Sequence, residues 1–124
     1  MGKHKTILFA EPQAVLPREL EEFVRERGYK AVRVSSLKET LLALQDMRVD
    51  AAVLSASLVE EDCEFISVIK NMRKDLPIIV CAEKNTPELE SRIRQQRIFY
   101  YHIKSFGVQD LEMAISNAVN GLQN

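Results

Sequence analysis

The chain has 124 residues, a formal net charge of −1, 46% hydrophobic residues and 28% charged residues. These values are ordinary for one globular domain, residues 1–124, and they exclude a disordered chain and a strong overall attraction to nucleic acid. No apolar run approaches the ~20 residues of a membrane span, and MGKHK leads straight into an apolar segment, so we expect no signal peptide, no membrane contact and a cytoplasmic location.

KTILFA, Lys5–Ala10, is a short apolar run that predicts a strand buried on both faces. The next segment predicts a helix that ends at Gly28, with Pro12 and Pro17 before or within its first turn. KAVRV, Lys30–Val34, predicts the second strand. The residues at helical spacing in the first helix are Val15, Leu16, Leu20, Phe23, Val24 and Arg27.

The second helix has two candidate N-caps, Ser35 and Ser36, and Glu39 is placed to complete a capping box. DAAVLS predicts a third buried strand that ends at Ser55, and a third helix is expected over about Cys63–Lys74. The apolar residues of the second helix are Leu37, Leu41, Leu42, Leu44 and Met47, and those of the third are Phe65, Ile66, Ile69 and Met72.

PIIVCA, Pro77–Ala82, predicts the fourth strand, and FYYHIK, Phe99–Lys104, the fifth. Between them a helix is expected with Thr86 as N-cap, Pro87 at its first position and a thin apolar face. That face consists mainly of Leu89 and Ile93. The last helix is expected over Asp110–Leu122, with its buried stripe formed by Leu111, Ala114, Ile115, Ala118, Val119 and Leu122.

Strands and helices therefore alternate five times, which predicts an α/β fold with a doubly wound parallel sheet and helices on both faces. In such sheets ligands bind at the carboxyl ends of the strands. The residues expected at those ends are Glu11, Pro12, Ser55, Ala82, Glu83 and Lys104.

Over essentially its whole length the sequence resembles the receiver domains of bacterial two-component response regulators, including chemotaxis-regulator-like receivers. The resemblance implies a (βα)5 flavodoxin-like three-layer sandwich with strand order 2-1-3-4-5. It places Glu11 and Pro12 at the paired acidic positions that hold Mg²⁺ and Ser55 at the phosphoacceptor position. In PIIVCAE, Ala82 takes the place of a hydroxyl residue. YHIKSF is similar to the segment with a switch aromatic and a lysine, here Tyr101 and Lys104; Ser105 replaces the usual proline and Phe106 matches.

The chain departs from this family at the residues that carry its chemistry, so we interpret it as a degenerate pseudo-receiver. Pro12 offers no side-chain oxygen to a metal ion, and Ser55 offers a neutral hydroxyl instead of an ionised carboxylate. Ala82 lacks the hydroxyl that contacts the phosphoryl group in receivers. We therefore expect no aspartyl phosphorylation, no catalytic residue, no bound metal and no cofactor. The acidic run Glu60–Asp62 is expected to be a solvated loop rather than a set of metal ligands.

Two interpretations of Lys104 remain open. Its ammonium either ties strand ends together, by pairing with Glu11 or bonding to Ser55, or it binds an anion. Tyr101 is expected to be a fixed, partly buried aromatic residue, because the hydroxyl partner of the family's switch is absent at Ala82.

The leading hypothesis is a stand-alone receiver that acts in two-component-type signalling by binding a protein, which could be a regulator, a kinase or an output protein. A weakly covered surface of the fourth helix, fifth strand and fifth helix would suit such a partner or a homodimer. Its candidate residues are Arg92, Arg97, Phe99 and Tyr100, with Arg94 beside them. We expect no output domain in this chain and therefore no direct contact with nucleic acid.

Three other functions are alternatives to this one. The first is a module that binds a small anion or nucleotide through Ser55, Lys104 and Ser105, although no Gly-rich phosphate loop supports it. The second is an enzyme that uses Ser55 with Glu11 or Lys104, but it lacks a third group to orient them. The third is a redox switch through Cys63 and Cys81, which requires Cα atoms within roughly 7 Å.

Overall fold

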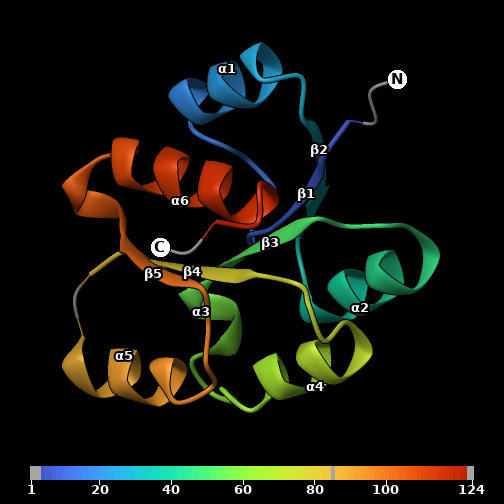
Figure 1. Cartoon of the computed structure of the whole chain (residues 1–124). Coiled ribbons are helices and arrows are strands. Elements are labelled where there is room, and N and C mark those ends of the chain that lie inside the picture. The colour runs from blue at the N-terminus through green and yellow to red at the C-terminus, as the bar shows by residue number, and fades with distance from the viewer. Residues whose placement is uncertain (1–3, 85, 123–124) are drawn as a thin grey trace.

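The computed structural model describes residues 4–84 and 86–122, so residues 1–3 of the amino-terminal segment lie outside it. It contains a five-stranded sheet with helices on both sides (Figure 1). The strands are β1 (Thr6–Ala10), β2 (Lys30–Val34), β3 (Ala51–Ser55), β4 (Ile78–Ala82) and β5 (Tyr100–Ile103). The α-helices are α1 (Arg18–Glu26), α2 (Leu37–Asp46), α3 (Ala56–Val59), α4 (Phe65–Met72), α5 (Pro87–Arg94) and α6 (Gln109–Val119), and the 3₁₀ helix η1 spans Lys104–Phe106.

All four strand pairings are parallel, and the strand order is β2-β1-β3-β4-β5. This confirms the predicted doubly wound sheet and its 2-1-3-4-5 order. Every residue of β3 and β4 is buried, as expected for central strands whose two faces are covered. The pairing Ser55↔Cys81 and then Cys81↔His102 places three chemically distinct side chains in one row across the sheet.

Two apolar layers fill the two faces of the sheet. In Figure 1 helices α1 and α6 lie on one side, and α2, α3, α4 and α5 lie on the other. The alternation of side chains along each strand sends Leu8 and Leu54 into the layer beneath α2 to α5, and Phe9 and Val53 into the layer beneath α1 and α6. None of the helices in the described ranges is long and apolar enough to cross a membrane.

Several helix ends follow the predicted local signals. The Ser36 hydroxyl accepts the Glu39 N–H at 3.1 Å, and the Glu39 carboxylate accepts the Ser35 N–H at 2.7 Å. These two bonds satisfy amide groups that a helix amino terminus leaves free. The backbone and side-chain hydrogen bonds that Ser35 donates to the Glu39 carboxylate lower the pKa of Glu39. Gly28 has a positive φ of 72° at the end of α1, as a glycine stop requires. Thr86 is the N-cap of α5 and Pro87 begins that helix, although the Thr86 side chain makes no capping bond.

Three residues that were predicted to lie on the apolar faces of helices are instead exposed: Val15, Leu42 and Leu122. Val15 lies before α1, because Pro17 is the N-cap and disfavours helical backbone at Leu16, the residue that separates it from Val15. Leu122 lies beyond the end of α6, and Leu42 faces solvent on α2. The four-residue helix α3, which begins directly after Ser55, was not predicted from the sequence pattern.

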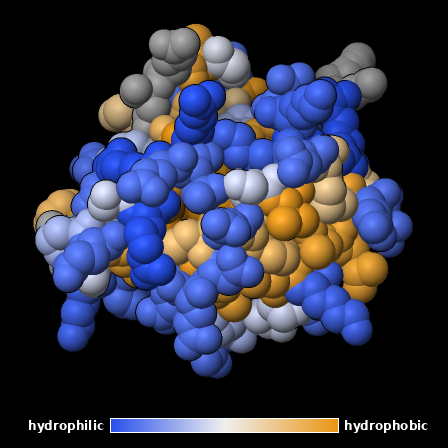
Figure 2. All heavy atoms as spheres, turned by 90° about the horizontal axis from the view of Figure 1, so that it is seen from below, coloured by the Kyte–Doolittle hydropathy of each residue, from blue (hydrophilic) through white to orange (hydrophobic). Residues whose placement is uncertain are grey.

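The face of the molecule that carries α4 and α5 is not evenly polar. Figure 2 looks at this face from below Figure 1 and shows hydrophobic atoms gathered on the side where α4 and α2 lie. Two of the exposed apolar side chains belong to these helices, Leu42 of α2 and Val68 of α4. The layer beneath them is nevertheless closed, since Leu44, Ile66 and Ile69 are fully buried.

Candidate functional site

The predicted site residues meet at one edge of the sheet, because parallel strands all end at the same edge. Glu11 follows β1, Ser55 ends β3, Ala82 ends β4 and Lys104 follows β5. Ser55 and Ala82 are buried, whereas Pro12 is exposed in the turn after Glu11. With Glu83, which follows Ala82, this edge therefore has two carboxylates, one hydroxyl and one ammonium group among the six residues predicted there.

Lys104 is held by two carboxylates. Its Nζ lies 3.0 Å from an oxygen of Glu83 and 4.0 Å from an oxygen of Glu11. Of the two partners considered for this lysine, Glu11 is the one it contacts; no bond from Lys104 to Ser55 is among the contacts of the described residues. Glu83, its nearer partner, had been given no role. The pairing of β4 with β5 would have indicated this contact. Ala82 and Ile103 are register partners, so the residues that follow them, Glu83 and Lys104, lie next to each other.

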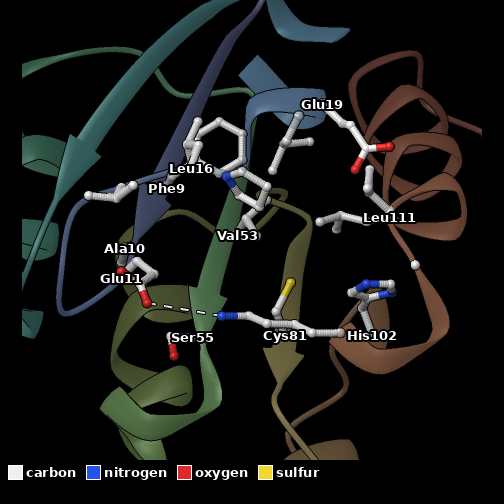
Figure 3. A pocket seen from close by; sticks show the side chains of 16 residues that line it. Phe9, Ala10, Glu11, Leu16, Glu19, Val53, Ser55, Cys81, His102 and Leu111 are labelled. Atoms are coloured by element: carbon white, nitrogen blue, oxygen red, sulfur yellow. Dashed lines mark ion pairs between the residues drawn. The ribbon is translucent and has the colours of Figure 1, made fainter. Parts of the chain in front are cut away.

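The Ser55 hydroxyl is hydrogen-bonded to Ser57, two residues further along the chain. It lies 2.9 Å from the Ser57 hydroxyl and accepts the Ser57 N–H at 3.4 Å, and so it caps α3. In Figure 3 the Ser55 oxygen points away from Glu11 and from the cavity in the foreground. The hydroxyl therefore has a local structural role, and within residues 4–84 and 86–122 no histidine or carboxylate is hydrogen-bonded to it as a base would be.

The residues at this edge do not fit a Mg²⁺ ion. Mg²⁺ prefers an octahedral set of oxygen ligands that includes one or two carboxylates. One oxygen of Glu11 already accepts the Gln13 N–H at 2.8 Å, and its other oxygen faces Lys104. Pro12 has no side-chain oxygen, and the Ser55 hydroxyl is neutral. Among residues 4–84 and 86–122, no group of three or more His, Cys, Asp or Glu side chains is arranged to hold a metal ion.

Solved structures share this architecture over nearly their full length, whereas no protein-family model matches the chain. The signal receiver domain of an HD domain-containing protein from Pseudomonas fluorescens Pf-5 aligns with a TM-score of 0.82 and 19% identity, covering 96% of this chain and 97% of that one. A CheY-like response regulator receiver domain protein from Methanospirillum hungatei JF-1 aligns with a TM-score of 0.81 and 16% identity, covering 96% of both chains. The chain has the receiver fold.

A curated relative matches this chain in sequence as well. The transcriptional regulatory protein PdtaR of Mycobacterium tuberculosis, matched in two strains, is 27% identical over 118 residues, which cover 94% of this chain and 57% of the relative. The chain thus spans little more than half the length of the curated relatives it matches.

Tyr101, at the position of the switch aromatic, lies inside the layer beneath α2 to α5. It is 4% exposed, the Arg94 guanidinium lies 5.5 Å from the centre of its ring, and burial raises the pKa of its hydroxyl. Among the described residues, its hydroxyl is a buried side-chain polar atom without a hydrogen-bond partner. Such a hydroxyl destabilises the folded state by about 1–3 kcal/mol relative to a paired one.

We expect Tyr101→Phe to raise the free energy of unfolding by about 1 kcal/mol, because it removes an unpaired buried hydroxyl and keeps the ring. Urea unfolding followed by circular dichroism measures this change. Tyr100→Phe is the matched control, since Tyr100 is half-buried, and its effect should be close to zero. A clear loss of stability in Tyr101→Phe would show that the hydroxyl has a partner in solution.

The predicted interface residues do not form one cluster. Phe99 and Tyr100 are half-buried and line a shallow depression with Arg94 and two residues of α6, Asp110 and Met113. The exposed residue Arg92 instead reaches the carbonyl oxygen of Glu60 at 3.2 Å, and Arg97 precedes β5 at the opposite edge of the sheet from Lys104. Glu60 itself is exposed, as are Glu61 and Asp62.

The two cysteines lie in different layers. Cys63 packs in the layer beneath α2 to α5, and Cys81 in the layer beneath α1 and α6. Both are buried free thiols, and the sheet separates them. The geometry does not support a disulfide-based switch between them.

Proposed function

We propose that this chain is an atypical receiver domain in two-component-type signalling that acts by binding a protein and is not controlled by aspartyl phosphorylation. The observation that carries the proposal is Ser55, a buried neutral residue at the carboxyl end of the central strand β3. Its hydroxyl is engaged in capping the next helix. A non-enzymatic module in the cytoplasm accords with this proposal, and both of these points stay predictions.

The surrounding charges support the same conclusion. In a phosphorylated site a lysine would be available to pair with the phosphoryl oxygens. Here Lys104 is already paired with Glu83 and faces Glu11, so its positive charge is balanced within the protein. Two carboxylates beside one ammonium leave a net negative charge at this edge, which disfavours a bound anion. For the same reason, no observation at this edge favours the alternative of a small-anion or nucleotide module.

Incubation of the native chain with acetyl phosphate and Mg²⁺ tests the proposal. We expect no mass gain of a phosphoryl group and, with beryllofluoride and Mg²⁺, no saturable shifts of the amide resonances of Ser55 and Lys104. The isolated receiver domain of Salmonella enterica RcsB, a structure solved in the presence of the phosphomimetic BeF3⁻, is a suitable positive control. Phosphorylation of the native chain, or saturable shifts at these two residues, would contradict the proposal.

The surface of α5, β5 and α6 is the proposed protein contact, either with a partner or with a second copy of the chain. It has a shallow depression lined by Phe99 and Tyr100, and Met113 at its side is 64% exposed. Apolar side chains beside charged ones, here Arg94 and Asp110, are typical of interface patches.

We expect Met113→Glu to weaken self-association of the chain at least tenfold, because it places a charge in the apolar part of this surface. Sedimentation velocity over a concentration series measures this. Val68→Glu is the matched control, because Val68 is also an exposed apolar residue but lies on α4, outside the surface of α5, β5 and α6. Equal effects of the two substitutions would place the contact elsewhere, and a native chain that is monomeric throughout would exclude the homodimer.

A further inference from the structure

A cavity of about 300 Å³ lies between α1 and α6, at the edge of the sheet where β1, β3 and β4 end (Figure 3). Its walls are mainly apolar and come from both helices and from the strands between them. They include Phe9, Leu16, Leu20, Val53 and Leu111, all of which are buried. This volume is at the lower end of the range for small-molecule sites, which are usually apolar clefts with a few polar groups.

Three buried side chains with a hydroxyl, thiol or imidazole group belong to the lining of this cavity: Ser55, Cys81 and His102. Cys81 and His102 are 5% and 3% exposed, they are paired across β4 and β5, and Figure 3 shows both side chains reaching into the cavity. Burial lowers the pKa of His102 and raises that of Cys81 to about 12, so both side chains are uncharged near neutral pH. The inner part of the cavity can therefore form hydrogen bonds without presenting a charge.

The charged groups at the cavity have an excess of negative charge. The positive group in the lining is Lys104, and it is already paired with Glu83 at 3.0 Å and faces Glu11. Glu19 extends from α1 beside Leu111 in Figure 3, and among the described residues it forms no ion pair or hydrogen bond. A ligand with a positive group would thus meet one unpaired carboxylate, and a ligand with a negative group would meet a lysine that is already neutralised.

We propose that this cavity binds a small molecule with an apolar body and one protonated amine, whose ammonium group pairs with Glu19. The apolar body would lie against Leu16, Leu20 and Leu111. This ligand site goes beyond the protein-binding role proposed above. Both include α6, but the cavity uses the buried Leu111 together with α1, whereas the protein-binding surface uses the exposed Met113 together with α5 and β5. Binding of this ligand would regulate the chain without phosphorylation of any residue.

Three probes with the same phenyl group and different head groups test the proposal: 2-phenylethylamine, 2-phenylethanol and 3-phenylpropionate. Amide resonances of the native chain report binding, and the ring resonances of His102 report entry into the cavity. We expect millimolar binding of the amine, about fivefold tighter than that of the alcohol, with the carboxylate weakest. Ethylamine, which lacks the apolar body, should not bind.

Two substitutions separate the charge from the cavity. Glu19→Gln should remove the fivefold advantage of the amine and leave the alcohol unchanged, whereas Glu26→Gln, a matched change on α1 outside the cavity lining, should leave both unchanged. Val108→Trp, at a half-buried lining position, should abolish binding of all three probes while the spectrum of the folded chain is retained. The proposal is overturned if the carboxylate binds best, if amine and alcohol bind equally, or if the shifts map to Arg94, Phe99 and Met113 and not to the cavity lining.

Discussion

The chain with Pro12→Asp, Ser55→Asp and Ala82→Thr is expected to gain Mg²⁺-dependent phosphorylation that the native chain lacks. Together with Glu11, the two new carboxylates would supply the oxygen ligands that Mg²⁺ requires. The carboxylate at position 55 would also be ionised at neutral pH and could accept a phosphoryl group without a neighbouring base. Intact-mass measurement after incubation with acetyl phosphate, with and without Mg²⁺, should show a change from no detectable product to a clear fraction of singly phosphorylated chain.

The matched control carries Ser55→Asn in place of Ser55→Asp, with the other two substitutions retained. An asparagine side chain has nearly the shape of aspartate but no nucleophilic carboxylate, so no phosphorylation is expected. Adding Glu83→Gln to the triple variant should increase the yield further, because it frees Lys104 from its nearer partner. If the triple variant folds and gains nothing, the backbone at Ser55 and in α3 has departed from the geometry that phosphorylation needs.

Leu54→Ala is expected to lower the free energy of unfolding by about 2–5 kcal/mol. Leu54 is fully buried in β3 and packs in the layer beneath α2 to α5, so its truncation removes apolar contacts and leaves a cavity. Leu42→Ala is the control, because Leu42 is 49% exposed on α2 and its truncation should cost less than about 0.5 kcal/mol. Chemical unfolding of both variants measures the difference; equal losses would mean that α2 is more deeply covered in solution.

The alternation of strands and helices and the covering of both sheet faces could be predicted from the sequence, because these depend on which residues are apolar and how often they recur. The strand order 2-1-3-4-5 was instead implied by the resemblance to receiver domains. Buried strands such as β3 and β4 are continuous apolar runs, and Gly28 and Ser36 are recognisable helix ends. The short helix α3 could not be predicted in this way. It has four residues, less than two turns, and its formation depends on the Ser55 cap as much as on its own residues.

The candidate site was predictable as a set of positions but not as a set of contacts. The ends of parallel strands bring Glu11, Ser55 and Lys104 to one edge whatever their side chains do. Which groups pair there depends on short distances that the sequence does not contain, so Glu83 was overlooked as the nearer partner of Lys104. The cavity was missed for a similar reason, because it is formed by the distance between α1 and α6 and not by any local pattern.

The separation of Cys63 and Cys81 by the sheet gives the chain a built-in pair of reporters of local opening. A buried thiol reacts with an alkylating reagent only when the structure around it opens, so its labelling rate measures the free energy of that opening. Because each layer holds one of the two thiols, their rates measure the opening of each layer separately. Peptide mapping after brief labelling of the native chain would therefore show which side of the sheet loosens first, and whether a ligand or a partner protein stabilises one layer without the other.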